Sequence, residues 1–413
     1  MGDFTKNAIV GHNISSFRFT KIGFDDIIII TPKFRIVNKE RYMYKNIKNY
    51  PDLWRYLQNT DKKILLYGMG NGADKILSVA QRYGIEISDF FASDGFVRGH
   101  TFHGKRVLSY SEAKEKYGGE NMIVLLSFAS RLDDVLENIY RIADECELYA
   151  PDVPVYGDEI FNIEFFEEHR EEIEAARKLF CDNESKRIYD LIIKYKLTGM
   201  ISYLRECESN IDECYNDILC ADSFEITADL GAYNGDSARE LMGYAENLKK
   251  IIAFEPDSRN YRKLLSWAEG IQGVEIEAHN LGAWDREDTL YFDASGNRNA
   301  SLTENISIFS DAINQRKKKI AEVKVNSLDN ILCGRRVDYI KYDVEGSEYE
   351  AICGSADTIK THKPSLLVSL YHQSRDVFFL PLYIKSICPE YSLCLRRFKY
   401  IPAWDINLYA KIN

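Results

Sequence analysis

Residues 226–237 read Ile-Thr-Ala-Asp-Leu-Gly-Ala-Tyr-Asn-Gly-Asp-Ser, a short apolar run that leads through two glycines. The next segment, 238–248, has apolar residues at helical spacing. Asp236 or Ser237 is suited to cap this helix, because either side-chain oxygen can accept a hydrogen bond from an unpaired backbone N–H. A strand, a glycine loop and a helix in this order bring the backbone close to a ligand and direct the positive end of the helix toward it. The stretch therefore predicts a binding loop.

A second apolar strand, 251–254, follows this helix and ends in Glu255. Glu255 lies 24 residues after Gly231. A nucleotide loop and the carboxylate that binds ribose hydroxyls are typically about 20 residues apart. Alone, the glycines could form a plain turn and the glutamate could be solvated. Together, their order and spacing predict a ligand that contains ribose.

The composition limits the classes of protein to consider. A chain of 413 residues suggests two or three domains, and a net charge of −11 argues against a nucleic-acid partner, which needs a basic surface. The nine cysteines are scattered and form no CxxC pair, which favours reduced thiols. The first residues lack a signal pattern, and the early apolar run 27–30 is too short to span a bilayer. We therefore expect a cytoplasmic protein with no nucleic-acid or membrane partner.

Strands and helices also alternate earlier in the chain. We expect strands at 62–66, 85–91 and 122–127 and helices at 74–83 and 132–142. Gly68, Gly70 and Ala73 fit the G-x-G-x-x-G/A pattern, and Asp94 follows the second strand, where a ribose-binding acid would lie. This pattern predicts a Rossmann-like unit that binds a nucleotide or nucleotide sugar. A glycine-rich packing turn without a ligand explains it equally well.

The rest of the chain is organised around these two units. Four parts are expected: an N-terminal extension (1–60), a Rossmann-like domain (61–157), a helical linker (158–220) and a second α/β domain (221–413). In the extension, 24–30 and 34–37 could pair as strands, ahead of a short helix at 52–57. In the linker, helices are expected at 160–179, 186–195 and 201–206, packed on the next domain with a solvated charged face.

The second α/β domain is expected to have a mixed sheet. We place strands at 225–230, 250–254, 274–280, 337–342 and 365–370, and a late antiparallel pair at 391–396 and 407–411. A parallel sheet that ends in an antiparallel hairpin distinguishes methyltransferase sheets from dehydrogenase sheets. An insertion, 289–326, contains a polar loop (296–301) and an expected basic helix (314–321). Such an insertion beside the sheet is expected to form a lid or a substrate wall.

The strand at 337–342 leads directly to a charged tip. If the extended conformation persists, alternation places Lys341, Asp343 and Glu345 on one side. Two carboxylates and a lysine are costly to bury without a task. The structural alternative is a network of Glu345, Ser347 and Glu348 that caps the start of the next helix. Because ligands bind at the carboxyl ends of such strands, we expect chemistry here.

Five sequence stretches together resemble the FkbM-type family of S-adenosylmethionine-dependent methyltransferases. They are Asp-Leu-Gly-Ala-Tyr-Asn-Gly (229–235), Phe-Glu-Pro (254–256), Val-Asn-Ser-Leu-Asp (325–329), Ile-Lys-Tyr-Asp-Val-Glu-Gly-Ser-Glu (340–348) and Asn-Leu-Tyr-Ala (407–410). The resemblance covers roughly residues 183–413, in order as well as in content. It implies a class I methyltransferase fold and O-methylation of a sugar, glycan or other hydroxylated metabolite.

The resemblance also implies roles for individual residues. The loop around Gly231 would hold the methionine end of the cofactor, Glu255 the ribose, and Asn280 and its successors would lie near the adenine. Asp343 and Glu345 would lie where methyl transfer occurs. The full set of cofactor-binding residues expected is Asp229, Gly231, Ala232, Tyr233, Asn234, Gly235, Ser237, Glu255, Pro256, Asn280, Gly282, Ala283 and Asp343. This chain departs from many relatives at the end of its fifth strand, where Tyr371-His372 stand in place of an acid.

In such a reaction a hydroxyl attacks the methyl group in line, and a base can help to remove its proton. The candidates are His372, Glu345 and Asp343, of which histidine has the most suitable unperturbed pKa. His372 could instead be a plain hydrogen-bonding residue. Asp343 with Glu345 could instead bind a divalent cation. The other histidines considered have no expected catalytic role. His100 and His103 are expected to be solvated, and His279 is expected to be structural.

Two other functions stay open. An oxidoreductase that binds NAD(P) or a nucleotide sugar would use the glycine turn at 68–72, although no Tyr-x-x-x-Lys pair follows it at a plausible distance. A non-catalytic sensor or assembly module would use either sheet only to bind a nucleotide. The expected partner of the enzyme is a small-molecule or glycan acceptor, and a homo-oligomer stays open.

Overall fold

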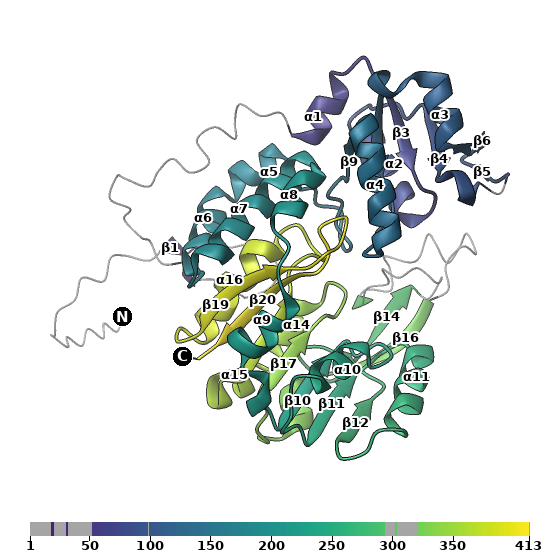
Figure 1. Ribbon diagram of the computed structural model, residues 1–413. Helices are drawn as coiled ribbons and strands as arrows, with labels where there is room; N and C mark the ends of the chain where they lie inside the picture. Colours follow the sequence, from purple (N-terminus) through teal and green to yellow (C-terminus); the bar gives the residue numbers. More distant parts are fainter. Residues whose placement is uncertain are drawn as a thin grey trace, which may run out of the picture. The chain divides into compact units, whose positions relative to one another are not determined.

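The computed structural model describes residues 18–19, 30–31, 52–97, 99–293, 302–303 and 320–412 (Figure 1). The chain divides into two units, 1–50 and 51–413. In the first unit, β1 (Arg18–Phe19) pairs antiparallel with β2 (Ile30–Thr31). The expected strand at 34–37 and most of 24–30 lie outside the described residues.

The second unit begins with a five-stranded parallel sheet in the order β7-β4-β3-β8-β9. Its strands are β3 (Lys63–Tyr67), β4 (Asp89–Ala92), β7 (Leu108–Ser109), β8 (Met122–Leu126) and β9 (Glu147–Tyr149). The helices are α1 (Leu53–Gln58), α2 (Asn71–Arg82), α3 (Tyr110–Tyr117) and α4 (Asp133–Glu145). A small hairpin, β5 (Thr101–Phe102) and β6 (Lys105–Arg106), precedes β7. This is the expected Rossmann-like arrangement.

The strand expected at 85–91 begins only at Asp89. Ile85 and Ile87 are buried as a strand pattern predicts, but the backbone N–H of Ile85 donates to Ala80 O (2.8 Å) at the end of α2. The helix therefore still uses the backbone that the strand would need.

A helical segment follows the first sheet. It contains α5 (Ile163–Glu168), α6 (Arg170–Leu179), α7 (Asn183–Thr198), α8 (Ile201–Glu206) and the short α9 (Ile211–Glu213). The single helix expected at 160–179 is wrong: it breaks at His169, whose backbone departs from helical geometry. α6 packs on α16 (Asp376–Ile387) and α7 on β19 (Ser392–Arg397), so this segment lies on the next sheet as expected.

The second large sheet has seven strands in the order β12-β11-β10-β17-β18-β20-β19 (Figure 1). The first five are parallel: β12 (Glu275–His279), β11 (Lys250–Phe254), β10 (Ile226–Leu230), β17 (Tyr339–Tyr342) and β18 (Ser365–Ser369). β20 (Ile406–Lys411) and β19 run antiparallel at one edge. The structure thus confirms the parallel sheet with an antiparallel hairpin.

The helices of this sheet are α10 (Asp236–Met242), α11 (Ser258–Ala268), α13 (Leu328–Leu332), α14 (Glu348–Cys353), α15 (Ala356–His362) and α16. α10 ends at Met242, with Gly243 as its C-cap, earlier than the expected 248. Gly235 occupies the N-cap, but Asp236 Oδ1 accepts from Ser237 N (3.0 Å) in the first turn, so Asp236 pairs an otherwise free backbone N–H as expected, whereas Ser237 does not. The Ser237 hydroxyl is used elsewhere, because it donates to Asp229 Oδ2 (2.6 Å).

The insertion between β12 and β17 forms a small sheet. Its order is β13-β16-β14-β15, with β13 (Gly282–Ala283), β14 (Asp288–Asp293), β15 (Leu302–Thr303) and β16 (Ile320–Asn326). Because β16 already begins at Ile320, the expected helix cannot reach 321. The rest of that helix, 314–319, and the loop at 296–301 lie outside the described residues. Within the described residues, no helix is both long and apolar enough to cross a membrane.

Candidate functional site

The carboxyl edge of the seven-stranded sheet collects charged groups from β10 and β17. Register pairs Asp229 with Lys341 on these neighbouring strands. Lys341 Nζ lies 3.5 Å from Asp229 Oδ1 and 3.3 Å from Asp343 Oδ2. Burial favours the neutral amine, but the two carboxylates outweigh it and raise the pKa of Lys341 above its usual value. Lys341 therefore stays charged and balances both acids.

The glycine loop after β10 is tight for steric reasons. Gly231 has a φ of +90°, and a Cβ there would lie 1.9 Å from the carbonyl oxygen of Asp343. Gly235 has a φ of +83°, and a Cβ there would lie 2.5 Å from the Trp267 ring. Only glycine fits these positions. The loop backbone consequently lies directly against the tip of β17.

The remaining loop residues are held by polar contacts. Gly231 N and Ala232 N both donate to Phe254 O, at 3.1 and 2.9 Å. Asn234 Oδ1 accepts from Arg239 (2.9 Å). Tyr233 has a φ of +49°, and its side chain is exposed. The loop is thus fixed by its own backbone and leaves the Tyr233 ring open to solvent.

Glu255 is buried where β11 ends, beside this loop. Its Oε2 accepts from Tyr233 N and its Oε1 from Asp257 N, both at 2.8 Å. Burial raises the pKa of Glu255 to about 7, although both hydrogen bonds oppose it. A carboxylate has about four lone-pair positions, so two remain for ligand hydroxyls.

The residues expected near the adenine divide between the turn after β12 and the small sheet. Asn280 lies next to Glu255, because its Nδ2 donates to the backbone oxygens of Glu255 (2.8 Å) and Pro256 (3.0 Å). Gly282 and Ala283 are buried in β13 and pair with β16 of the small sheet. Asn280 therefore fixes the geometry around Glu255, whereas Gly282 and Ala283 begin the insertion.

Asp343 is a permanent anion at the tip of β17. Its Oδ1 accepts from Ser369 Oγ and Tyr371 OH, both at 3.0 Å. Burial would raise its pKa, but Lys341, His372 and these two hydroxyls hold it at about 2. Such a weak base cannot take a proton from a hydroxyl near neutral pH.

His372 is fully buried among three carboxylates. Its Nδ1 lies 2.9 Å from Glu348 Oε1, and its Nε2 lies 3.6 Å from Glu345 and 3.7 Å from Asp343. Burial lowers its pKa, but the carboxylates prevail and raise it to about 10. An imidazolium has no free lone pair, so this charge state argues against the expected role of His372 as the base.

Glu345 has the strained backbone and the perturbed carboxyl of this edge. Its φ is +55°, unfavourable for a residue other than glycine. Its side chain is half exposed, yet desolvation, with Asp343 and Glu348 beside it, raises its pKa to about 7 against the effect of His372. Glu345, like Glu255 at the end of β11, can therefore exchange a proton near neutral pH, but only Glu345 does so at the tip of β17 beside Asp343 and His372. The alternative network is also present, since Glu348 Oε1 accepts from Val344 N (2.9 Å).

Possible ligand atoms of Asp343, Glu348 and His372 lie within 4.8 Å of one another. A bound cation would lie close to the ammonium of Lys341, which is 3.3 Å from Asp343. This positive charge repels a metal ion. We therefore assign no divalent cation to this edge, either in this trio or in the expected pair Asp343 and Glu345.

The glycine turn of the first sheet is explained by packing. A Cβ on Gly72 would lie 2.1 Å from Ser127 O, and one on Gly68 would lie 2.7 Å from Ser127 Oγ. Asp94, the expected ribose acid, accepts from Ser111 N (2.9 Å) and Ser111 Oγ (2.8 Å). A cavity of about 680 Å³ lies along α2 and the β5–β6 hairpin and is not lined by this turn. No cofactor is assigned to the first sheet.

Contacts from the first part of the second unit reach the charged edge, which the sequence did not reveal. Tyr156 N donates to His372 O (2.9 Å), and the Tyr156 ring covers Gly346. Lys75 of α2 donates to the carbonyl of Val155 (2.5 Å), and its charge interacts with Glu345. Ser130 and Ile401 exchange two backbone hydrogen bonds, at 2.9 and 3.0 Å.

This mixed sheet, with a glycine loop after β10 and a buried acid after β11, is the arrangement expected of an S-adenosylmethionine-dependent methyltransferase. The family model described as the methyltransferase FkbM domain matches residues 229–391. The chain therefore carries an FkbM methyltransferase domain at residues 229–391, and this family uses S-adenosylmethionine as the methyl donor.

One solved structure shares this fold over most of the chain. A methyltransferase FkbM from Methylobacillus flagellatus KT is 21% identical with a TM-score of 0.62, over 84% of this chain and 90% of that chain. An rRNA methylase from Streptococcus thermophilus is 14% identical with a TM-score of 0.29, over 48% and 92%. An Aeropyrum pernix fibrillarin with bound S-adenosyl-L-methionine is 11% identical with a TM-score of 0.27, over 46% and 66%. No curated protein sequence matches the chain.

Proposed function

We propose that this enzyme transfers the methyl group of S-adenosylmethionine to a hydroxyl oxygen of a sugar, glycan or other small-molecule acceptor. The observation that carries the proposal is the half-exposed Glu345 carboxyl, whose pKa of about 7 suits it to accept a hydroxyl proton. Asp343 and His372 beside it hold fixed opposite charges. Glu345 is therefore the base, with Asp343 and His372 as positioning residues.

The cofactor would occupy the edge between the glycine loop and Glu255. When bound, it supplies an electrophilic methyl group. Asp229, the backbone of the loop 231–235 and Ser237 would hold its methionine end, and Glu255 would accept hydrogen bonds from the ribose hydroxyls. The fit rests on two observations: the loop has no room for side chains at its glycines, and Glu255 is buried with lone pairs unused.

The acceptor would approach Glu345 from the side of Tyr156 and Lys75. The Tyr156 side chain contacts Gly346, next to Glu345. Lys75 adds a positive charge, and burial lowers the pKa of its ammonium group. An aromatic ring beside hydrogen-bonding groups suits a polyhydroxylated ligand, which has both apolar C–H faces and hydroxyls. The first sheet would then help to position the acceptor.

The test is methyl transfer by the full-length protein to a panel of monosaccharides, oligosaccharides and polyols. We expect release of S-adenosylhomocysteine together with a methyl ether on one acceptor. Glu345→Gln should lose transfer and keep cofactor binding. Binding of S-adenosylhomocysteine with methylation only of nitrogen or carbon acceptors would contradict the hydroxyl acceptor, and absence of binding would contradict the cofactor site.

A further inference from the structure

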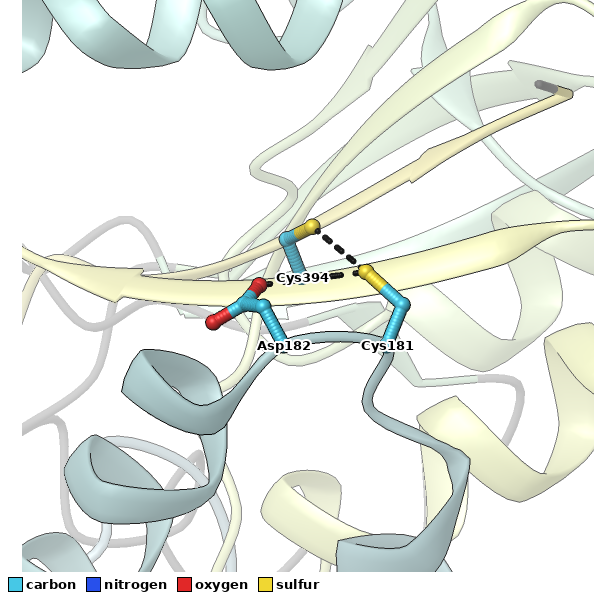
Figure 2. Close-up of side chains that lie close together, drawn as sticks. All are labelled: Cys181, Asp182 and Cys394. Atoms are coloured by element: carbon cyan, nitrogen blue, oxygen red, sulfur yellow. Dashed lines mark hydrogen bonds between the residues drawn. The ribbon is translucent and has the colours of Figure 1, made fainter.

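Two cysteines meet where the helical segment joins the large sheet (Figure 2). Cys181 lies in the turn between α6 and α7, and Cys394 lies in β19, the edge strand. Their sulfur atoms are 3.1 Å apart, although 213 residues separate them in the chain. Asp182, the third member of the cluster, lies beside them.

The backbone geometry at this junction suits a covalent link. Phe180 forms a parallel bridge with Leu393, and Cys181 N donates to Leu393 O (2.9 Å). The two cysteines directly follow this bridged pair. Neighbouring strands lie about 5 Å apart, and disulfide-bonded cysteines usually have Cα atoms 4.4–6.8 Å apart. The main chain therefore needs no rearrangement for a bond between the two sulfurs.

A metal ion fits this cluster less well. Tetrahedral zinc with Zn–S bonds of about 2.3 Å would hold two sulfurs about 3.8 Å apart, farther than they are here. Each oxygen of Asp182 already accepts one hydrogen bond, from Ser185 N (2.6 Å) and Ser185 Oγ (2.7 Å) at the start of α7, so a metal ion would compete with this helix cap. Arg396 also lies 3.5 Å from Asp182 and would repel a cation. The two thiols are thus the reactive groups.

We propose that Cys181 and Cys394 form a reversible disulfide with a low-molecular-weight disulfide as oxidant. The Cys181 thiolate attacks one sulfur of the oxidant and expels the first small thiol. The Cys394 sulfur then attacks Cys181 in this mixed disulfide, loses its proton and expels the second small thiol. Two protein thiols are oxidised by two electrons, and one small disulfide is reduced to two thiols.

The order of attack follows from exposure. Cys181 is exposed, whereas Cys394 is half-buried. Burial raises the pKa of the Cys394 thiol, and contacts with Cys181 and Asp182 raise it further. Cys394 is therefore a poor first nucleophile. Within the mixed disulfide its proximity to Cys181 compensates for this.

The disulfide would fix the start of α7 to the edge strand. It would close a loop of more than 200 residues, and such a link restricts the unfolded chain strongly. We expect the midpoint of thermal unfolding to rise by about 5 °C on oxidation. Reduction by excess thiol should return it to the original value.

The experiment treats the full-length protein with oxidised glutathione and compares Cys181→Ser, Cys394→Ser and Cys333→Ser. Cys333 is an exposed control whose thiol donates to Asn330 O (2.9 Å). Peptide mass mapping should find the 181–394 link in the parent and in Cys333→Ser. Thermal unfolding of the same two proteins should show the rise in the midpoint. Cys181→Ser and Cys394→Ser should each lose both the 181–394 link and the rise in the unfolding midpoint.

Three results would overturn the proposal. The first is full alkylation of both Cys181 and Cys394 after oxidation, and the second is a mixed disulfide on Cys181 that never resolves. The third is one equivalent of zinc that the purified protein retains, that protects both thiols and that Cys181→Ser releases. That last result would identify a metal site instead.

Discussion

His372 Nδ1 lies 2.9 Å from Oε1 of Glu348, and both side chains are almost completely buried. A buried ion pair keeps its charge only if both partners are present, since the loss of either leaves an unpaired charge in a poorly polarisable environment. Glu348 belongs to α14 and His372 follows β18, so this pair joins two neighbouring elements at the charged edge. It also sets the charge state of the group next to Glu345.

The first prediction concerns stability as a function of pH. The pKa of His372 is about 10 in the folded protein and 6.5 in the unfolded chain. The charged imidazolium of His372 therefore contributes fully to the stability of the fold below pH 6.5, and this contribution is lost as pH rises toward 10. The free energy of unfolding should fall across this range, by up to about 1.4 kcal/mol per pH unit for one proton. Denaturant unfolding between pH 6.5 and 10 measures it.

His372→Gln should remove this slope. Asp376, whose pKa burial raises to about 8, gives a slope of the same sign below pH 8. The difference between the parent and His372→Gln therefore isolates the histidine. Equal slopes for both proteins would show that His372 is neutral when buried.

The second prediction concerns the base. Glu345→Gln should lower kcat about 10²- to 10⁴-fold, because the hydroxyl proton loses its acceptor. In the parent, kcat/KM should rise with pH and level off above about 7, where Glu345 is ionised. Initial rates with the identified acceptor between pH 5.5 and 9 measure both effects.

Glu350→Gln is the matched control for that substitution. Glu350 lies in α14, and burial also raises its pKa to about 7. The same chemical change at Glu350 should leave the rate and its pH profile unchanged. If kcat fell in both Glu345→Gln and Glu350→Gln, or in neither, Glu345 could not be the base.

The third prediction concerns Glu255. Glu255→Ala should weaken S-adenosylhomocysteine binding by about 1.5–3 kcal/mol, the usual contribution of a hydrogen bond to a charged group. Glu275→Ala removes an exposed carboxylate of β12 that pairs with Lys250 (2.8 Å) and should leave affinity unchanged. Calorimetric titration of both variants gives the comparison. Unchanged affinity in folded Glu255→Ala would exclude this carboxylate from ribose binding.

The sequence predicted the centre of the seven-stranded sheet well because β10, β11 and β17 are short, largely apolar runs that are each followed by a glycine or an acid. β11, Lys250–Phe254, has the expected bounds. The break of the expected helix at His169 was missed, since apolar residues continue at helical spacing on both sides of it. The local sequence pattern thus predicts the presence of a helix or strand more reliably than the residues at which it begins and ends.

The properties of the candidate site depend on contacts that no local pattern contains. The charge of His372 is set by Glu348, 24 residues earlier, and the Asp94 carboxyl is occupied by Ser111, 17 residues later. The proximity of Lys75 to Glu345 depends on how two sheets pack. Residue types alone therefore identified the edge of the sheet but not which group can accept a proton.

The last prediction separates the two glycine loops. Gly72→Ala would place a Cβ 2.1 Å from Ser127 O and should lower the free energy of unfolding by about 1–3 kcal/mol through overpacking. Around Gly70 there is open space, so Gly70→Val should disturb packing less, although its φ of +140° is unfavourable for valine. Both variants should keep the parent affinity for S-adenosylhomocysteine, because the cofactor is expected at the loop 231–235. Calorimetric titration alongside denaturant unfolding distinguishes the two effects, and loss of cofactor binding in stably folded Gly70→Val would place the cofactor in the first sheet instead.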